Sequence, residues 1–385
     1  MLRILGLFVL FVLPAVACKW DRDTLKEESK GNLDTVKAIT GWFDRYPARY
    51  YEMRLERVAK EVADQPERLD LYDDAGVACD RLGRFDDAIA WMERKDARLQ
   101  ALPAADNAEH RYRYLANLGS FYMDRWISRA PEVRNADLAD LREAEKLVAA
   151  AIELNPDAHF GRERYQLQMI RWLLKDGPAE KFEWMSFIEP EAWSSRKSEE
   201  KAVAGLTGLI LLGEGWMSTD IFSSLYVSLE NMNLASLAEL AYCRGKELEE
   251  AGAKSLHPLE EVRAKMGYEP SMSLTEEKRR VVAEYFKRAR AAAKSRHSAW
   301  IQYQEARFAR GQHPDSDPRF WDEWKEPEFP EFPRMTFWEW VQRNPLTAFW
   351  SAFVLTIVGV LGLLRFLKRF DSSKSKARVA SELAA

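Results

Sequence analysis

The stretch LYDDAGVACDRLGRFDDAIAWMER, residues 71–94, decides the fold. Its apolar residues recur at three- and four-residue spacing on both sides of a central glycine, which predicts two helices joined by a tight turn. Gly76 and Ala88 are small, so the two helices can approach each other closely there. Tyr72 and Phe85 are large and fill the adjacent gaps. The stretch therefore predicts one helix–turn–helix unit.

This spacing resembles the tetratricopeptide repeat (TPR), a helix–turn–helix unit of about 34 residues. On that resemblance, the packing residues of the first copy are Tyr72, Gly76, Phe85 and Ala88, with Gly83 at the turn. A second copy follows, and its packing residues are Leu118, Gly119, Tyr122, Ala144, Ala151 and Pro156. Residues 128–137 are an insertion that departs from the repeat pattern and forms either a loop or an extension of one of the flanking helices.

Three further helical segments, 202–214, 219–232 and 234–252, follow the two clear copies. Two copies are fewer than the roughly three that a repeat stack needs for stability, so the later segments must complete the stack. We therefore expect an all-α fold: a TPR-like helical-repeat superhelix with a long C-terminal helix, an extended linker and a single transmembrane helix.

The long helix is predicted from a capping box, Ser273-Leu-Thr-Glu276, and extends to about residue 310. Lysine and arginine are in excess along it. Three interpretations fit this excess: a solvated helix that packs on the repeats, a contact with anionic lipid headgroups, or a surface for an acidic partner.

The N-terminus predicts export. Residues 1–17 combine Arg3, a short apolar run and an Ala-x-Ala motif, which is typical of a secretory signal peptide. The motif is followed by Cys18, and Val-Ala-Cys also resembles a bacterial lipobox. Lipidation of Cys18 and ordinary cleavage before it are both consistent with the sequence.

The C-terminal part predicts a membrane anchor. Residues 346–364 carry no charge and would extend about 28 Å as a helix, enough to cross a bilayer. Lysines and arginines cluster after this span, so its C-terminal side is expected in the cytoplasm. We expect a single-pass protein of the bacterial inner membrane, with the bulk of the chain in the periplasm. A cleaved sorting signal is the alternative, but no sorting motif precedes the span.

These patterns divide the chain into a signal peptide at 1–17, an N-terminal helical segment at 19–65, TPR-like repeats at 66–158, a degenerate helical-repeat region at 159–270, a long basic helix at 271–312, a Pro- and aromatic-rich linker at 313–343, a transmembrane helix at 344–366 and a cytoplasmic basic tail at 367–385.

Composition argues against several classes of function. The formal net charge of −4 lacks the basic bias of a nucleic-acid binder, so no nucleic acid is expected as a partner. Cys79 and Cys243 fit helical apolar faces, although a single disulfide between them is an alternative in an oxidising compartment. No phosphate-binding loop, nucleophile elbow or zinc-protease motif occurs. We therefore predict no catalytic residues, no metal site and no cofactor.

The resemblance implies that the first helices of the repeats line a groove that binds extended peptides. The groove positions carried over from the repeat family are Asp70, Asp73, Val77, Asp80, Arg81, Arg113, Ala116, Ser120, Met123 and Asp124. The first-copy set is acidic, which favours a partner with a basic segment, unless these charges merely solvate the groove.

The function expected from these patterns is that of a membrane-anchored periplasmic scaffold, which binds protein or peptide partners in the cell envelope. Two alternatives remain open. One is an envelope enzyme with an unrecognised site in 159–270, and the other is a structural tether if Cys18 carries a lipid.

Overall fold

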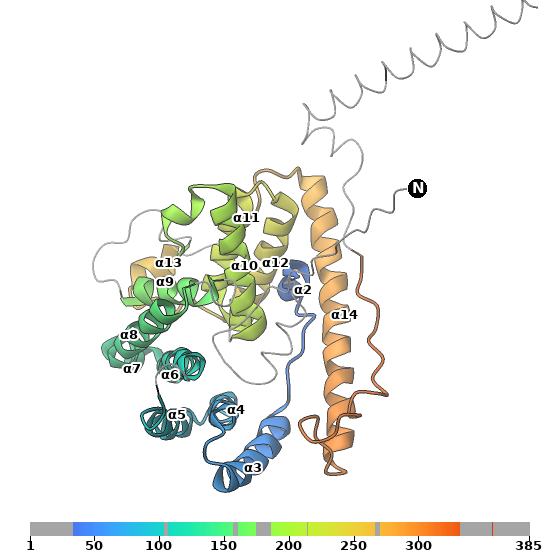
Figure 1. The fold of residues 1–385 in the computed structure, drawn as a ribbon. Coiled ribbons are helices and arrows are strands. Elements are labelled where there is room, and N and C mark those ends of the chain that lie inside the picture. The colour runs from blue at the N-terminus through green and yellow to red at the C-terminus, as the bar shows by residue number, and fades with distance from the viewer. Residues whose placement is uncertain are drawn as a thin grey trace, which may run out of the picture. The chain divides into compact units, whose positions relative to one another are not determined.

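A computed structural model describes residues 34–331, apart from 104–106, 157–160, 175–185, 214 and 266–269, together with Thr356. All regular elements among these residues are helices, as expected for an all-α fold (Figure 1). The predicted signal peptide, Cys18 and, apart from Thr356, the predicted span and tail lie outside the described residues. No helix within the described part has both the length and the apolar character needed to cross a membrane.

The elements of the first half are α2 (Thr35–Thr40), α3 (Ala48–Asp64), α4 (Leu69–Arg81), α5 (Phe85–Leu99), α6 (Ala108–Ser128), α7 (Pro131–Ala136) and α8 (Ala139–Leu154). The elements of the second half are α9 (Arg162–Leu174), η4 (Pro190–Trp193), α10 (Arg196–Leu212), η5 (Gly215–Met217), α11 (Thr219–Asn231), α12 (Ala235–Glu250), α13 (Glu260–Lys265) and α14 (Glu276–Phe308).

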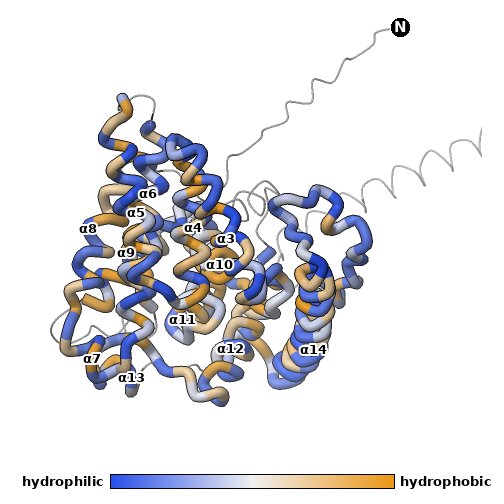
Figure 2. The backbone as a smooth tube through the Cα atoms, turned by 90° about the horizontal axis from the view of Figure 1, so that it is seen from below, coloured by the Kyte–Doolittle hydropathy of each residue, from blue (hydrophilic) through white to orange (hydrophobic). Residues whose placement is uncertain are grey.

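From α3 to α6 each helix packs against the next, and α6, α8, α9, α10, α11 and α12 continue the array (Figure 1). Hydrophobic and hydrophilic positions alternate along these helices (Figure 2), so each can bury one face against its neighbours. The turn between α4 and α5 is made at Gly83, whose φ of 72° favours glycine, as the sequence predicts.

The predicted packing residues are mostly internal. The buried ones are Tyr72, Gly76, Ala88, Leu118, Gly119, Ala144 and Ala151, the half-buried ones are Phe85 and Tyr122, and the exposed ones are Gly83 and Pro156. A Cβ atom at Gly76 would lie 2.9 Å from Met92 of α5 and 3.0 Å from Phe121 of α6. Glycine therefore lets α4 pack closely against both helices.

Three local features either differ from what the sequence predicts or decide between its alternatives. The insertion contains a short separate helix, α7, after α6 has continued to Ser128. The predicted capping box is wrong in register: the N-cap of α14 is Thr275, whose side chain accepts a hydrogen bond from the backbone of Lys278. The Ser273 hydroxyl instead contacts Glu230 at 3.2 Å. Cys79 and Cys243 are free thiols rather than a disulfide.

The basic helix α14 uses part of its charge inside the protein. Arg290 is buried and pairs with Glu247 of α12 at 2.7 Å. Arg296 is also buried and pairs with Asp44 at 2.7 Å and with Glu326. These two arginines hold α14 in the fold, so they are not part of a basic surface for lipids or an acidic partner.

The segment that follows α14 makes several turns and then returns along the helix in the opposite direction as an extended strip (Figure 1). Tyr303 donates its hydroxyl hydrogen to the carbonyl of Phe320, and Tyr285 donates to the carbonyl of Pro330 at 3.1 Å. The ring of Phe329 lies 5.1 Å from that of Trp42. Most of residues 314–323 form hydrogen-bonded turns, and only the Pro- and Glu-rich part from residue 324 to residue 331 is extended, as its composition suggests. Both parts of the predicted linker pack on the domain. We call residues 313–331 the return segment.

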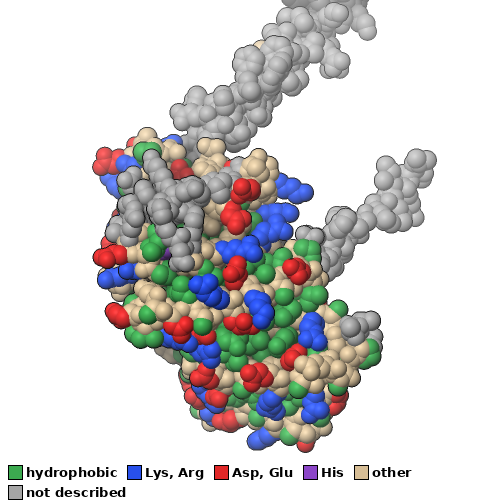
Figure 3. Space-filling view, turned by 90° about the vertical axis from the view of Figure 1, so that its left-hand side faces the viewer, with side chains coloured by type: hydrophobic (Ala, Val, Ile, Leu, Met, Phe, Trp, Pro, Cys, Tyr) green, Lys and Arg blue, Asp and Glu red, His purple; other side chains and the backbone are tan. Residues whose placement is uncertain are grey.

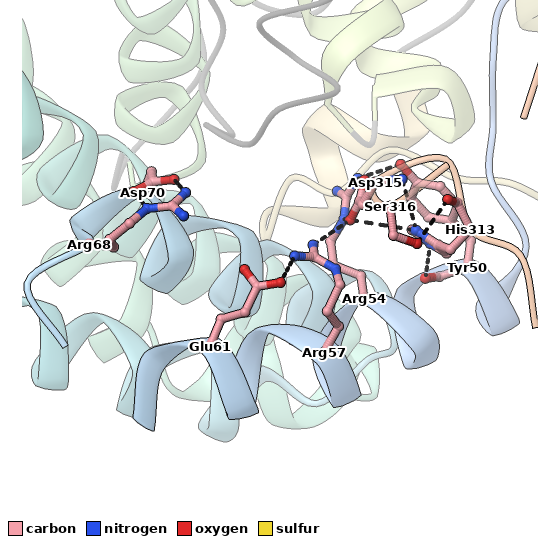
Figure 4. Close-up of polar contacts among 9 residues, drawn as sticks. All are labelled: Tyr50, Arg54, Arg57, Glu61, Arg68, Asp70, His313, Asp315 and Ser316. Carbon is pink, nitrogen blue, oxygen red and sulfur yellow. Dashed lines mark hydrogen bonds and ion pairs between the residues drawn. The ribbon is translucent and has the colours of Figure 1, made fainter. Parts of the chain in front are cut away.

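The start of the return segment is fixed to α3 by a buried polar cluster (Figure 4). The Arg54 guanidinium donates two hydrogen bonds of 2.8 Å to the carboxylate of Asp315, and both side chains are almost fully buried. His313 accepts the backbone N–H of Asp315 at Nδ1, so its Nε2 donates to the carbonyl of Tyr50 at 3.0 Å. Burial lowers the pKa of His313 to about 4, which keeps this ring neutral.

Candidate functional site

A pocket of about 440 Å³ lies among α4, α6, α9, α10 and the start of α11. Most of its wall is apolar, with charged groups from several helices. The residues that line it are Asp80, Arg81, Gly83, Phe85, Ser120, Met123, Asp124, Ile127, Ser128, Arg162, Gln166, Met169, Leu209, Gly213, Gly215, Met217, Ser218, Ile221, Lys254 and Leu256.

Helical spacing explains how α6 and α9 supply two walls. On α6, Ser120, Asp124 and Ile127 recur at intervals of four and three residues, so they share one face. On α9, Gln166 and Met169 lie on the face that begins with Arg162 in the same way.

Glycines on α10 let α9 approach it closely. A Cβ atom at Gly208 would lie 3.2 Å from Cδ of Arg162, whose stem crosses that glycine. The Arg162 guanidinium donates to the Gly208 carbonyl at 3.5 Å. At Gly205, an added Cβ would overlap the ring of Tyr165. The absence of a side chain at Gly205 therefore sets how closely α9 approaches α10, whereas at Gly208 a small shift of the Arg162 stem would make room.

The segment that carries Lys254 and Leu256 is held in place by Asp220 of α11. The Asp220 carboxylate is fully buried and accepts the backbone N–H of Leu256 at 2.8 Å. Burial raises the pKa of this carboxyl to about 6. Ser218 caps α11 by accepting the N–H of Ile221.

Five of the predicted groove residues come together at the pocket: Asp80, Arg81, Ser120, Met123 and Asp124. Arg81 also donates to the carbonyl of Leu212 at 3.2 Å, which ties α4 to the end of α10. The other five, Asp70, Asp73, Val77, Arg113 and Ala116, do not line it.

Two of the acidic positions have structural roles instead. Asp73 is buried with Lys95 of α5, whose ammonium lies 2.7 Å from both carboxylate oxygens, and Asp73 also accepts from Asn117. Asp70 pairs with Arg68 at the surface. The expectation of a basic partner segment rested on this acidic set, so it loses much of its support.

The sequence-based groove missed the half of the pocket contributed by 162–256. The repeat resemblance has faded there, so no groove position could be transferred to α9, α10 or α11. The available signal was the polar residues on an otherwise apolar α9, especially Arg162 and Gln166, both of which are buried.

The pocket offers apolar surface and hydrogen-bonding groups. Over the residues that the structure describes, no three histidine, cysteine or acidic side chains gather as metal ligands would. Because the pocket combines apolar surface with hydrogen-bonding groups, it is suited to binding an amphipathic group.

No family model, curated protein or solved structure matches this chain. The TPR resemblance therefore stays a prediction from the sequence.

Proposed function

We propose that this chain is a membrane-anchored scaffold that binds a segment of a partner protein in the pocket among α4, α6, α9 and α11. The observation that carries the proposal is the pocket itself, because apolar walls with a few polar groups are typical of binding sites. The stacked helix pairs support a TPR-like superhelix as the scaffold, since consecutive helices pack in chain order and α4 also contacts α6.

The pocket has features of a surface that adapts to side chains of different shapes. Met123, Met169 and Met217 line it, and thioether side chains are flexible and polarizable.

Figure 3 shows that on the face beside α8 and α13 hydrophobic side chains lie between charged side chains of both signs. Such a mixed surface suits a protein partner better than a polyanion.

The proposed location is the periplasmic face of a bacterial inner membrane, with the chain anchored by residues 344–366. It rests on the apolar span and the basic residues after it. Exposure of the helical domain outside the cytoplasm would let the pocket meet other envelope proteins.

Site-specific photo-crosslinking tests the proposal. A photoreactive residue at Met217, which lines the pocket and is 59% exposed, should form crosslinks to a discrete partner in cells. The matched control is Val133 on α7, which is 55% exposed and does not line the pocket. Crosslinks at both positions, or at neither, would contradict a specific pocket interaction.

A pocket-filling variant provides the second comparison. Ser128 is exposed and lines the pocket, so Ser128→Trp should abolish the crosslink from position 217 without unfolding the protein. Ser298→Trp on the exposed side of α14 should leave that crosslink unchanged.

A further inference from the structure

We infer that the pocket recognises a peptide in which a large apolar anchor lies next to a carboxylate, with Lys254 as the group that selects the carboxylate. This inference rests on the proposed function and names the chemistry of the bound segment.

The charged residues that line the pocket fall into two groups. Asp80, Arg81, Asp124 and Arg162 each have a polar or ionic interaction within the protein. Lys254 is exposed at the pocket, and no hydrogen bond or ion pair is formed by its side chain with any residue that the structure describes. Its ammonium is therefore available to a ligand, and it favours an anionic group.

Lys254 is held near the pocket by contacts of its neighbours rather than its own. Asp220 fixes the backbone two residues further on, at Leu256, and Leu256 is itself part of the pocket wall. An anchor side chain seated against Leu256 would therefore place an adjacent carboxylate beside the Lys254 ammonium.

The apolar wall defines the anchor. Met123, Met169, Leu209, Ile221 and Leu256 contribute side chains to a volume of about 440 Å³, which is enough for a leucine or an aromatic side chain and its neighbours. Burial of such a side chain supplies most of the affinity, whereas the exposed carboxylate contact contributes selectivity.

Gln166 favours a peptide over a free acyl chain. Its side-chain nitrogen donates to Ser120 at 3.2 Å, but its buried Oε1 has no hydrogen-bond partner among the described residues. Buried amide oxygens usually have a partner. A peptide can supply an N–H donor to this oxygen, whereas the carboxylate of a fatty acid cannot.

The test uses the full-length protein in detergent and a random heptapeptide display library. Wild type should enrich peptides that carry Leu, Phe, Tyr or Trp beside Asp or Glu, and Ser128→Trp should enrich none of them. The best peptide is then synthesised with its acidic residue intact or replaced by the matching amide, Asn or Gln, and Kd is measured.

The carboxylate should improve binding to wild type about fivefold, as expected for an exposed ion pair. It should have no effect on binding to Lys254→Ala, and the fivefold effect should persist in Lys197→Ala, an exposed lysine of α10 outside the pocket. Enrichment of apolar peptides whose affinity does not depend on the carboxylate overturns this inference but leaves the proposed function standing.

Failure to enrich any peptide would overturn both proposals. In that case oleate binding to wild type but not to Ser128→Trp would assign the pocket to an acyl carboxylate.

Discussion

Asp220 is a single carboxyl that should set part of the pH dependence of stability. Burial raises its pKa from 3.8 to about 6, so between these two values the folded protein binds more protons than the unfolded chain. The free energy of unfolding therefore falls as the pH rises through this window. The stabilisation that the raised pKa of Asp220 provides is fully present below the pKa of this group in the unfolded chain, and it is lost above its pKa in the folded protein.

Asp220→Asn tests this effect, since asparagine can still accept the N–H of Leu256 but cannot ionise. The free energy of unfolding of the variant minus that of wild type should increase by about 2–3 kcal/mol when the pH is raised from 4 to 8, as measured by urea unfolding. Asp322→Asn, at an exposed position, should show no such trend. An equal effect of Asp220→Asn at both pH values would mean that the carboxyl titrates normally.

Asp73 shows what the sequence could not predict at the residue scale. Helical spacing correctly places it on one face of α4, but it does not reveal that Lys95 and Asn117 occupy the same space. Asp80 and Asp124, assigned by the same reasoning, do reach the pocket. Helical periodicity predicts the face of the helix on which a side chain lies, whereas the residues that the side chain contacts depend on tertiary packing.

At the scale of elements, the close approach of α9 and α10 should be sensitive to one methyl group. Gly205→Ala should lower the free energy of unfolding by about 1–3 kcal/mol, because the new Cβ overlaps the buried Tyr165 ring. This loss should exceed the helix-propensity gain of about 1 kcal/mol.

Gly208→Ala, one turn along on α10, is the matched control. Its nearest neighbour is the flexible stem of Arg162 at 3.2 Å, so the change should be close to neutral. Chemical unfolding of both variants measures the difference. Equal stabilities would mean that α9 can shift away from α10 at little cost.

Helix positions were predicted well where apolar periodicity is strong. The segments expected at 219–232 and 234–252 correspond to α11 and α12 with differences of one or two residues. The start of α14 was misplaced because Ser273 and Thr275 are both suitable caps. Ser273 instead donates to Glu230, a residue distant in sequence, and this contact leaves Thr275 as the N-cap. The local sequence pattern does not predict such a contact.

For the whole molecule, the return segment is the largest feature that the sequence did not predict. Its composition indicates the extended backbone of residues 324–331 but not the turns before them. Its contacts with Trp42, Tyr50 and Arg54 join positions far apart in the chain. No local pattern encodes such pairings, since each depends on where two distant elements meet.

Asp315→Ala should detach the start of this segment. The change leaves the buried Arg54 guanidinium without its carboxylate, which should cost about 3–5 kcal/mol. Hydrogen exchange should show loss of protection over 313–331 before global unfolding. Asp322→Ala, an exposed position in the same segment, should retain wild-type protection. Unchanged exchange in Asp315→Ala would show that the ion pair does not hold the segment.

The proposed topology gives a prediction for the entire chain. An epitope tag after Gly252, in an exposed turn, should be accessible in spheroplasts with an intact inner membrane. A tag after Ala385 should be accessible only after lysis. A tag near Ser316 would be unsuitable, because that residue donates to His313 within the polar cluster (Figure 4). The reverse accessibility would exclude the proposed orientation.

The pairing of Arg54 with Asp315 also has a consequence for biosynthesis. The two residues are 261 positions apart, so a ribosome adding about 5–20 residues per second needs roughly 13–50 s to supply the second after the first. During that interval α3 emerges with a cation that has no carboxylate to meet it. The contact that fixes the return segment to α3 can therefore form only after nearly the whole helical domain has been synthesised.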